Sequence, residues 1–141
     1  METKVLNILL VDDDQVDVMN VERAFKQNKS QNHLYVAENG IEALAMLRGQ
    51  RDVIVPPVER LILLDLNMPR MGGIEFLREL RADPTLKPIP VIVLTTSNED
   101  SDKVEAYHLN VAGYILKPVT FSKFVEAMVA VHQYWTLSEL L

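Results

Sequence analysis

Residues 61–69 read LILLDLNMP. The first four residues form an apolar run, and a carboxylate follows it directly. The run Leu61–Leu64 has no polar position, which is typical of a strand buried on both faces of a parallel sheet. Asp65 ends the run, and a turn containing Pro69 follows it. We therefore interpret this stretch as the central strand of a sheet, with Asp65 at its carboxyl end.

Apolar runs of this kind alternate with amphipathic stretches along the rest of the chain. The other runs that predict strands are residues 5–11, 34–37, 91–94 and 114–116. Apolar spacing predicts helices at residues 16–27, 41–47, 74–80, 100–108 and 121–135, of which the fourth is the most polar. Parallel strands need crossover connections, and right-handed crossovers place helices on both faces. We predict an α/β fold: a doubly wound five-stranded parallel sheet, order 2-1-3-4-5, with flavodoxin-like layering.

Length and composition describe one ordinary domain over residues 1–141. A chain of 141 residues that is 48% apolar can bury a substantial core. Its net charge of −6 argues against a nucleic-acid partner, and the absence of cysteine excludes disulfides and thiolate metal ligands. No apolar run is long enough to span a membrane, and the N-terminus does not look like a secretion signal. We expect a cytoplasmic protein that does not bind membranes.

Five polar side chains are predicted to meet at one edge of the sheet. Asp12 and Asp13 follow the first strand, Asp65 the third, Thr95 the fourth and Lys117 the fifth. The carboxyl ends of parallel strands lie along the same edge, where doubly wound sheets bind their ligands. Two negative charges about 4 Å apart repel by roughly 4 kcal/mol at an effective dielectric of 20. A bound cation would relieve this repulsion. Because only oxygen ligands are available to hold it, the pattern predicts a Mg²⁺ site.

These residues also suggest phosphoryl transfer. With Mg²⁺ and Lys117 offsetting the negative charge, a phosphoryl group could approach a carboxylate. Asp65 is the best nucleophile because it stands alone on the central strand, whereas Asp12 and Asp13 are better placed to hold metal. Thr95 and Lys117 would bind phosphoryl oxygens, and Asn67 would offer its backbone carbonyl to the metal.

With these residues in place, the chain resembles the receiver domains of two-component response regulators. The motifs LVDDD at 10–14, LDLNMP at 64–69, VLTT at 93–96 and YILKP at 114–118 occur in the order of that family. The resemblance implies that Asp65 accepts a phosphoryl group from a histidine kinase and that Tyr114 moves inward with Thr95 as a switch. It also implies Mg²⁺ binding at Asp12, Asp13, Asp65 and the Asn67 carbonyl. The peptide bond between Lys117 and Pro118 is expected to be cis.

The chain departs from the family pattern at Gly72, where many members have an acidic residue. We expect the pair Gly72-Gly73 to loosen the turn after the phosphorylation site. Tyr114 is open to a second interpretation, because simple packing would require the same residue.

A narrower resemblance is to the stand-alone regulators that pair with bacterial and cyanobacterial phytochromes. It rests on AY at 106–107, KPVTF at 117–121 and YWTLSELL at 134–141. Those relatives have no output domain and often dimerise, which implies a phytochrome as kinase partner and a homodimer here. Residues 133–141 would then form a dimerising extension with Trp135, Leu137 and Leu140 at the interface. A frayed terminus is the alternative for this segment.

The leading hypothesis is therefore a phosphorylated switch and not an enzyme, although it would phosphorylate and dephosphorylate itself with Mg²⁺. An aspartyl-phosphate phosphatase would place a second acid two residues after its nucleophile, where this chain has Asn67. A flavin carrier would need a glycine-rich phosphate loop in place of the aspartates at 12–14. A scaffolding domain that does not use its acidic pocket remains a further alternative.

Overall fold

The computed structural model describes residues 5–27, 32–117 and 120–137, and in them strands and helices alternate. The strands are β1 Asn7–Val11, β2 His33–Ala37, β3 Arg60–Leu64, β4 Val91–Thr95 and β5 Gly113–Leu116. The helices are α1 Gln15–Gln27, α2 Gly40–Leu47, α3 Gly73–Ala82, α4 Asp100–His108 and α5 Phe121–Leu137. All strand pairs are parallel and the order is β2-β1-β3-β4-β5, so the predicted fold and strand order are confirmed.

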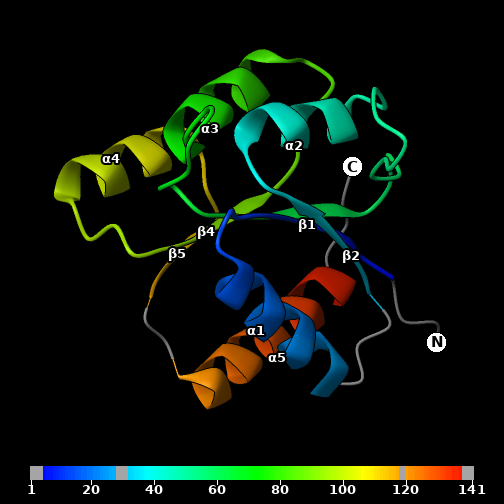
Figure 1. Ribbon diagram of the computed structural model, residues 1–141, viewed down its shortest axis with the longest axis vertical. Coiled ribbons are helices and arrows are strands. Elements are labelled where there is room, and N and C mark those ends of the chain that lie inside the picture. Colours follow the sequence, from blue (N-terminus) through cyan, green and yellow to red (C-terminus); the bar gives the residue numbers. More distant parts are fainter. Residues whose placement is uncertain (1–4, 28–31, 118–119, 138–141) are drawn as a thin grey trace.

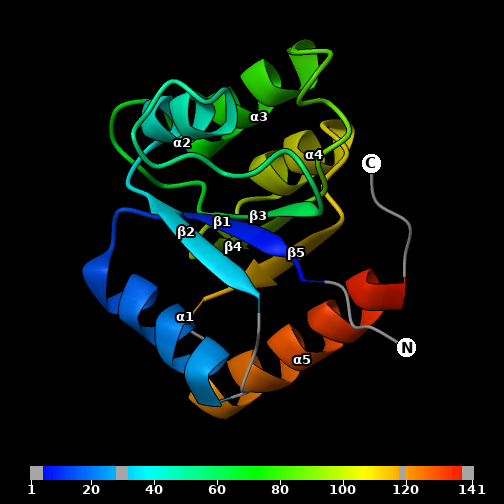
Figure 2. The ribbon, with the colours of Figure 1, turned by 90° about the vertical axis from the view of Figure 1, so that its right-hand side faces the viewer.

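The sheet separates two layers of helices. Helices α2, α3 and α4 cover one face, and α1 and α5 lie side by side on the other (Figures 1 and 2). The central strand β3 supplies both cores, because successive side chains point to opposite faces. Ile62 and Leu64 pack toward α2 and α3, whereas Leu61 and Leu63 pack toward α1 and α5. All five residues of β3 are buried, as its unbroken apolar sequence predicts.

Strand register places the ends of β1 and β3 level with each other. Val11 pairs with Leu64, and the amide of Asp65 donates to the Val11 carbonyl at 2.9 Å. On the other side of β3, Thr95 is the last residue of β4, and the amide of Lys117 donates to its carbonyl at 2.8 Å. The pairing therefore brings residues from four chain segments to one edge.

The loop before β3 is anchored by a buried arginine. The guanidinium of Arg60 donates to the carbonyls of Pro56, Leu47 and Val55 at 2.9, 2.8 and 2.6 Å. Burial lowers the pKa of Arg60. These three hydrogen bonds fasten the loop between α2 and β3 to the start of β3.

Several predicted features fall at the C-terminal end. Helix α5 continues through Leu137, so residues 133–137 of the expected extension prolong this helix. The side chains of Trp135 and Leu137, and the whole of Leu140, lie outside the described residues, as does Pro118. In the described part of the chain, no helix is both long enough and apolar enough to cross a membrane.

Candidate functional site

Three carboxylates meet where β1 and β3 end. Oxygen atoms of Asp12, Asp13 and Asp65 all lie within 4.8 Å of one another. Asp12 and Asp65 are buried, whereas Asp13 is exposed at the rim. The predicted convergence of these acids is thus present in the structure, and it follows directly from the level register of the two strands.

The environment of Asp12 disfavours its negative charge. Burial raises the pKa of Asp12 from 3.8 to about 6. The backbone amide of Asp14, which donates to Asp12 Oδ1 at 2.9 Å, and the ammonium of Lys117 act in the opposite direction, while the charge of Asp65 adds to the rise. An added cation would relieve the cost of ionising this group.

Asp65 and Thr95 contact each other directly. The Thr95 hydroxyl donates to Asp65 Oδ1 at 2.8 Å, and the amide of Asn67 donates to the same oxygen at 3.2 Å. Thr95 is fully buried, and its oxygen also accepts from the amides of Leu66 and Ser97 at 3.4 and 3.3 Å. The hydroxyl therefore joins the end of β3 to the loop that follows β4.

Lys117 contacts three different acids. Its Nζ lies 3.1 Å from Asp12 Oδ2, 3.7 Å from Asp65 Oδ2 and 2.5 Å from Asp17 Oδ2, and its side chain is only 9% exposed. Burial alone would lower the pKa of Lys117, but the hydrogen bond that its ammonium donates to Asp17 and the charges of Asp12 and Asp65 outweigh this effect and raise the pKa. The ammonium is thus held charged inside the acidic cluster.

Asp17 is the site residue that sequence reasoning missed. It lies in the first turn of α1, 100 positions from Lys117 in the chain. Acidic residues are common in first turns because they complement the helix dipole, so the residue type gave no signal. Its neighbour Asp14 has a different role: the Asp14 carboxylate accepts from the amides of Val16 and Asp17 at 2.8 and 3.3 Å at the start of α1.

The turn after Asp65 differs from the expected loose glycine pair. Gly72 has an ordinary φ of −67°, and the left-handed residues are Arg70 and Met71, with φ of 52° and 77°. Gly73 is required by close approach, since a Cβ there would lie 2.6 Å from the Cα of Leu66. The turn is therefore held tightly against the end of β3 rather than loosened.

Tyr114 on β5 points back toward the site. Its ring is partly buried against the core, and its hydroxyl donates to the Ser97 carbonyl at 2.7 Å. The Ser97 hydroxyl in turn donates to Asp102 at the start of α4, at 2.5 Å. Burial raises the pKa of the Tyr114 phenol. A chain of contacts thus runs from Thr95 through the β4–α4 loop to Tyr114.

Asn67 lies at the open side of the cluster. Its side chain is exposed and donates to the Thr96 hydroxyl at 3.2 Å. Its amide is engaged with Asp65, and a role for its carbonyl in metal binding stays a prediction.

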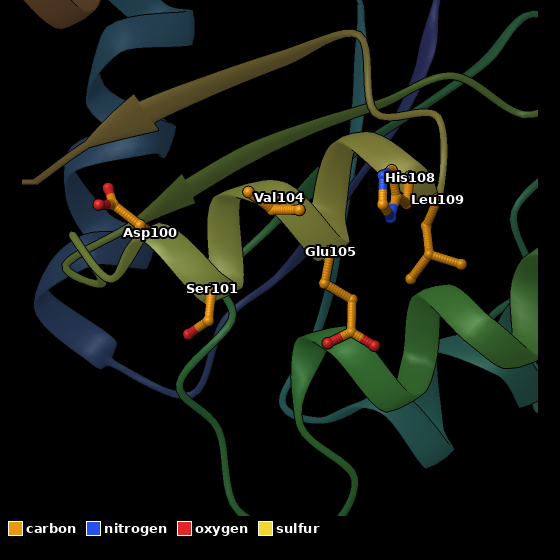
Figure 3. Close-up of a pocket in the computed structure, with 6 residues that line it drawn as sticks. All are labelled: Asp100, Ser101, Val104, Glu105, His108 and Leu109. Carbon is orange, nitrogen blue, oxygen red and sulfur yellow. The ribbon is translucent and has the colours of Figure 1, made fainter.

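A separate hollow runs along α4 and faces α3 (Figure 3). It is lined by Asp100, Ser101, Val104, Glu105, His108 and Leu109, and none of the clustered acids, Thr95 or Lys117 contributes to it. Glu105 points toward α3 in this view and forms an ion pair with Arg78 of that helix. The convergent chemistry therefore lies at the sheet edge and not in this hollow.

Comparison with known proteins agrees with the fold. The model of the response regulator receiver domain matches residues 8–129. Response regulator Rcp1 of Synechocystis sp. is 35% identical over 128 residues, which cover 91% of this chain and 87% of Rcp1. The structure of the phosphorylated cyanobacterial phytochrome response regulator RcpA is similar, with a TM-score of 0.83, 34% identity and coverage of 97% and 99% of the two chains. The Mn²⁺-bound form of Rcp1 has a TM-score of 0.79 at 34% identity, covering 95% and 96%.

The chain belongs to the response regulator receiver domain family. Within that family it is related to phytochrome-associated response regulators of two-component systems. Receiver domains are signalling switches and not conventional enzymes.

Proposed function

We propose that this protein is a stand-alone response regulator that accepts a phosphoryl group on Asp65 in a Mg²⁺-dependent reaction. The observation that supports the proposal most directly is the surroundings of Asp65. A buried hydroxyl from Thr95 lies 2.8 Å from one of its oxygens, and the Lys117 ammonium lies 3.7 Å from the other. A nucleophilic carboxylate flanked by a neutral donor and a cation is suited to receive a dianionic group.

The acidic cluster fits a divalent cation. Asp12, Asp13 and Asp65 lie within 4.8 Å of one another, and Lys117, which also pairs with Asp17, is the cation that contacts two of them. Oxygen ligands from one or two carboxylates are the usual protein contribution to a Mg²⁺ site. Asp12, Asp13 and Asp65 would hold the ion together with the Asn67 carbonyl, and Mg²⁺ when bound would offset the repulsion between these acids and an incoming phosphoryl group. The Mn²⁺-bound form of the related Rcp1 supports a divalent cation here.

In this reaction the protein positions the reacting groups and neutralises their charge. An oxygen of Asp65 attacks the phosphorus while the bond from phosphorus to the histidine nitrogen of the donor breaks, and that nitrogen keeps the electron pair. Thr95 donates its hydroxyl to one phosphoryl oxygen, and Lys117 pairs with another. The leaving imidazole then takes a proton from water. Hydrolysis of the acyl phosphate later restores the free carboxylate.

Signalling would follow from a change of partner by Thr95. When its hydroxyl binds the phosphoryl group, the β4–α4 loop that it holds through the Ser97 amide is expected to move with it. Tyr114 is hydrogen-bonded to the same loop at the Ser97 carbonyl, so the two residues would act together as the switch. The phosphoryl group must favour one arrangement of this loop over the other to shift the population.

The partner that we propose is a histidine kinase of the phytochrome type, on the strength of the related Rcp1 and RcpA. We also propose a cytoplasmic location, with output through contacts with other proteins. A homodimer formed through residues 133–141 belongs to the same proposal. Trp135 is of a residue type that often anchors interfaces, and Leu137 and Leu140 add apolar side chains to the same segment. Sedimentation of the W135S/L140S variant across concentrations tests this part. An unchanged mass distribution would refute it.

Acetyl phosphate provides the test of phosphorylation. The protein is incubated with the donor and Mg²⁺, and its intact mass is measured over time. We expect a single phosphoryl adduct in the wild type and in Asp52→Asn, an exposed loop acid that serves as control, but none in Asp65→Asn or with EDTA. An adduct that persists in Asp65→Asn would overturn the assignment of the acceptor. Rapid, continuous release of phosphate would favour an aspartyl-phosphate phosphatase instead.

A further inference from the structure

The contact between Asp17 and Lys117 has no place in the phosphoryl transfer described above. Asp17 Oδ2 lies 2.5 Å from the ammonium, closer than Asp12 at 3.1 Å or Asp65 at 3.7 Å. The shortest ion pair of Lys117 is thus made with a residue outside the group of predicted metal ligands and phosphate binders. Charge-assisted bonds of this length are the stronger ones in proteins.

We propose that Asp17 is a positioning residue that restrains Lys117 on the α1 side of the site, and that phosphoryl transfer to Asp65 draws Lys117 away from Asp17. This inference rests on the proposed function, because it concerns the same reaction. The residue does not touch the reacting atoms and acts only through the ammonium group.

The arrangement of the three acids supports this restraint. Lys117 is almost fully buried, so its ammonium has few alternatives to these carboxylates, whereas the Asp17 side chain is 26% exposed. Asp17 can therefore be left to water when the lysine moves, at much lower cost than leaving a buried acid without a partner. The partner that Lys117 can release most readily is the one that it contacts most closely.

The restraint also connects the site to the helices behind it. Asp17 belongs to α1, which packs against α5 beneath the sheet (Figure 2), while Lys117 directly follows β5, the strand that precedes α5 in the chain. Before phosphorylation the ion pair ties the first turn of α1 to the end of β5. A shift of Lys117 toward a phosphoryl group on Asp65 would loosen this tie.

Substitution of Asp17 distinguishes a restraint on Lys117 from a general effect of negative charge on the binding of the phosphodonor. The rate of phosphorylation by acetyl phosphate is measured at saturating Mg²⁺ as a function of donor concentration. If Asp17 restrains Lys117, Asp17→Asn should raise the maximal rate roughly three- to tenfold, since less attraction must be overcome to move the ammonium. A general loss of negative charge would instead lower the half-saturating donor concentration and leave the maximal rate unchanged, which would overturn the proposal.

Two further variants make the test specific. Asp17→Glu keeps the carboxylate and should return the maximal rate toward that of the wild type. Glu22→Gln removes one charge from an exposed position of the same helix and should not change it. Thermal unfolding of each variant shows that the fold is intact.

The two proposals can fail separately. A lower maximal rate in Asp17→Asn would mean that Asp17 holds Lys117 in its working position, and it would overturn the restraint while leaving Asp65 as acceptor. Failure of the wild type to gain a phosphoryl group would remove the proposed function and this inference with it.

Discussion

Replacement of Asp12 by asparagine is expected to stabilise the metal-free protein at neutral and alkaline pH. The side chain is about 1% exposed, so solvent screens its charge very little. Burial raises its pKa from 3.8 to about 6, and each pKa unit corresponds to about 1.4 kcal/mol. Ionising Asp12 in the folded state therefore costs about 3 kcal/mol relative to the unfolded chain.

The sign of the pH dependence follows from the raised pKa. A carboxyl group whose folded pKa lies above its unfolded value stabilises the fold fully below pH 3.8, and this stability is lost as the pH rises through about 6. Asp12→Asn keeps an oxygen for the Asp14 amide but cannot ionise. We expect the variant to be about 3 kcal/mol more stable than the wild type at pH 8, or roughly 6–12 °C in Tm, with the difference shrinking toward zero near pH 4.

The assay is urea or thermal unfolding in EDTA at several pH values, with Asp52→Asn as a control for the loss of an exposed charge. Mg²⁺ at 100 times its Kd should nearly cancel this difference, because a ligand at that concentration stabilises the folded wild type by about 2.7 kcal/mol. If Asp12→Asn were less stable than the wild type at pH 8 without metal, or if the difference did not change with pH, the electrostatic reasoning would be wrong.

Four further substitutions test the surroundings of the site by urea denaturation. Gly73→Ala should lose about 2 kcal/mol or more, since its Cβ would lie 2.6 Å from the Cα of Leu66, whereas Gly72→Ala, with its nearest contact at 3.5 Å, should change stability by less than about 0.5 kcal/mol. Arg70→Gly should gain about 1 kcal/mol because it relieves a φ of 52°, and an unchanged midpoint would argue against strain there. Arg60→Met should lose about 2–4 kcal/mol, because three carbonyls lose their donor; a loss below 1 kcal/mol would show that water replaces it.

Most of the site could be predicted from where apolar runs stop. Asp12, Asp65 and Lys117 each follow a run, and Thr95 ends one. Strand ends in a parallel sheet share an edge, so sequence position alone predicted that these side chains would meet. Asp17 could not be found in this way, because its place beside Lys117 depends on how α1 leaves β1 and on the path of a side chain from the opposite end of the domain.

The conformation of the turn after Asp65 could not be predicted from the sequence either. Two adjacent glycines suggested looseness, but in the structure the left-handed conformations belong to Arg70 and Met71, and Gly73 is needed because backbone passes close to it. Neither fact can be read from residue type, since φ angles and close approaches are set by the packing of α3 against β3.

The sequence by itself determined the fold class and the set of groups at the sheet edge, because hydrophobic periodicity and the rules of parallel sheets are local or topological. The strand order was predicted only as the common arrangement for five units, and the structure established it. The tertiary structure decided which of those groups touch. Hydrogen bonds and ion pairs depend on tenths of an ångström, and only the packed helices set such distances. Thus the sequence placed Lys117 among acids, and the structure showed that Asp17 is the one it contacts most closely.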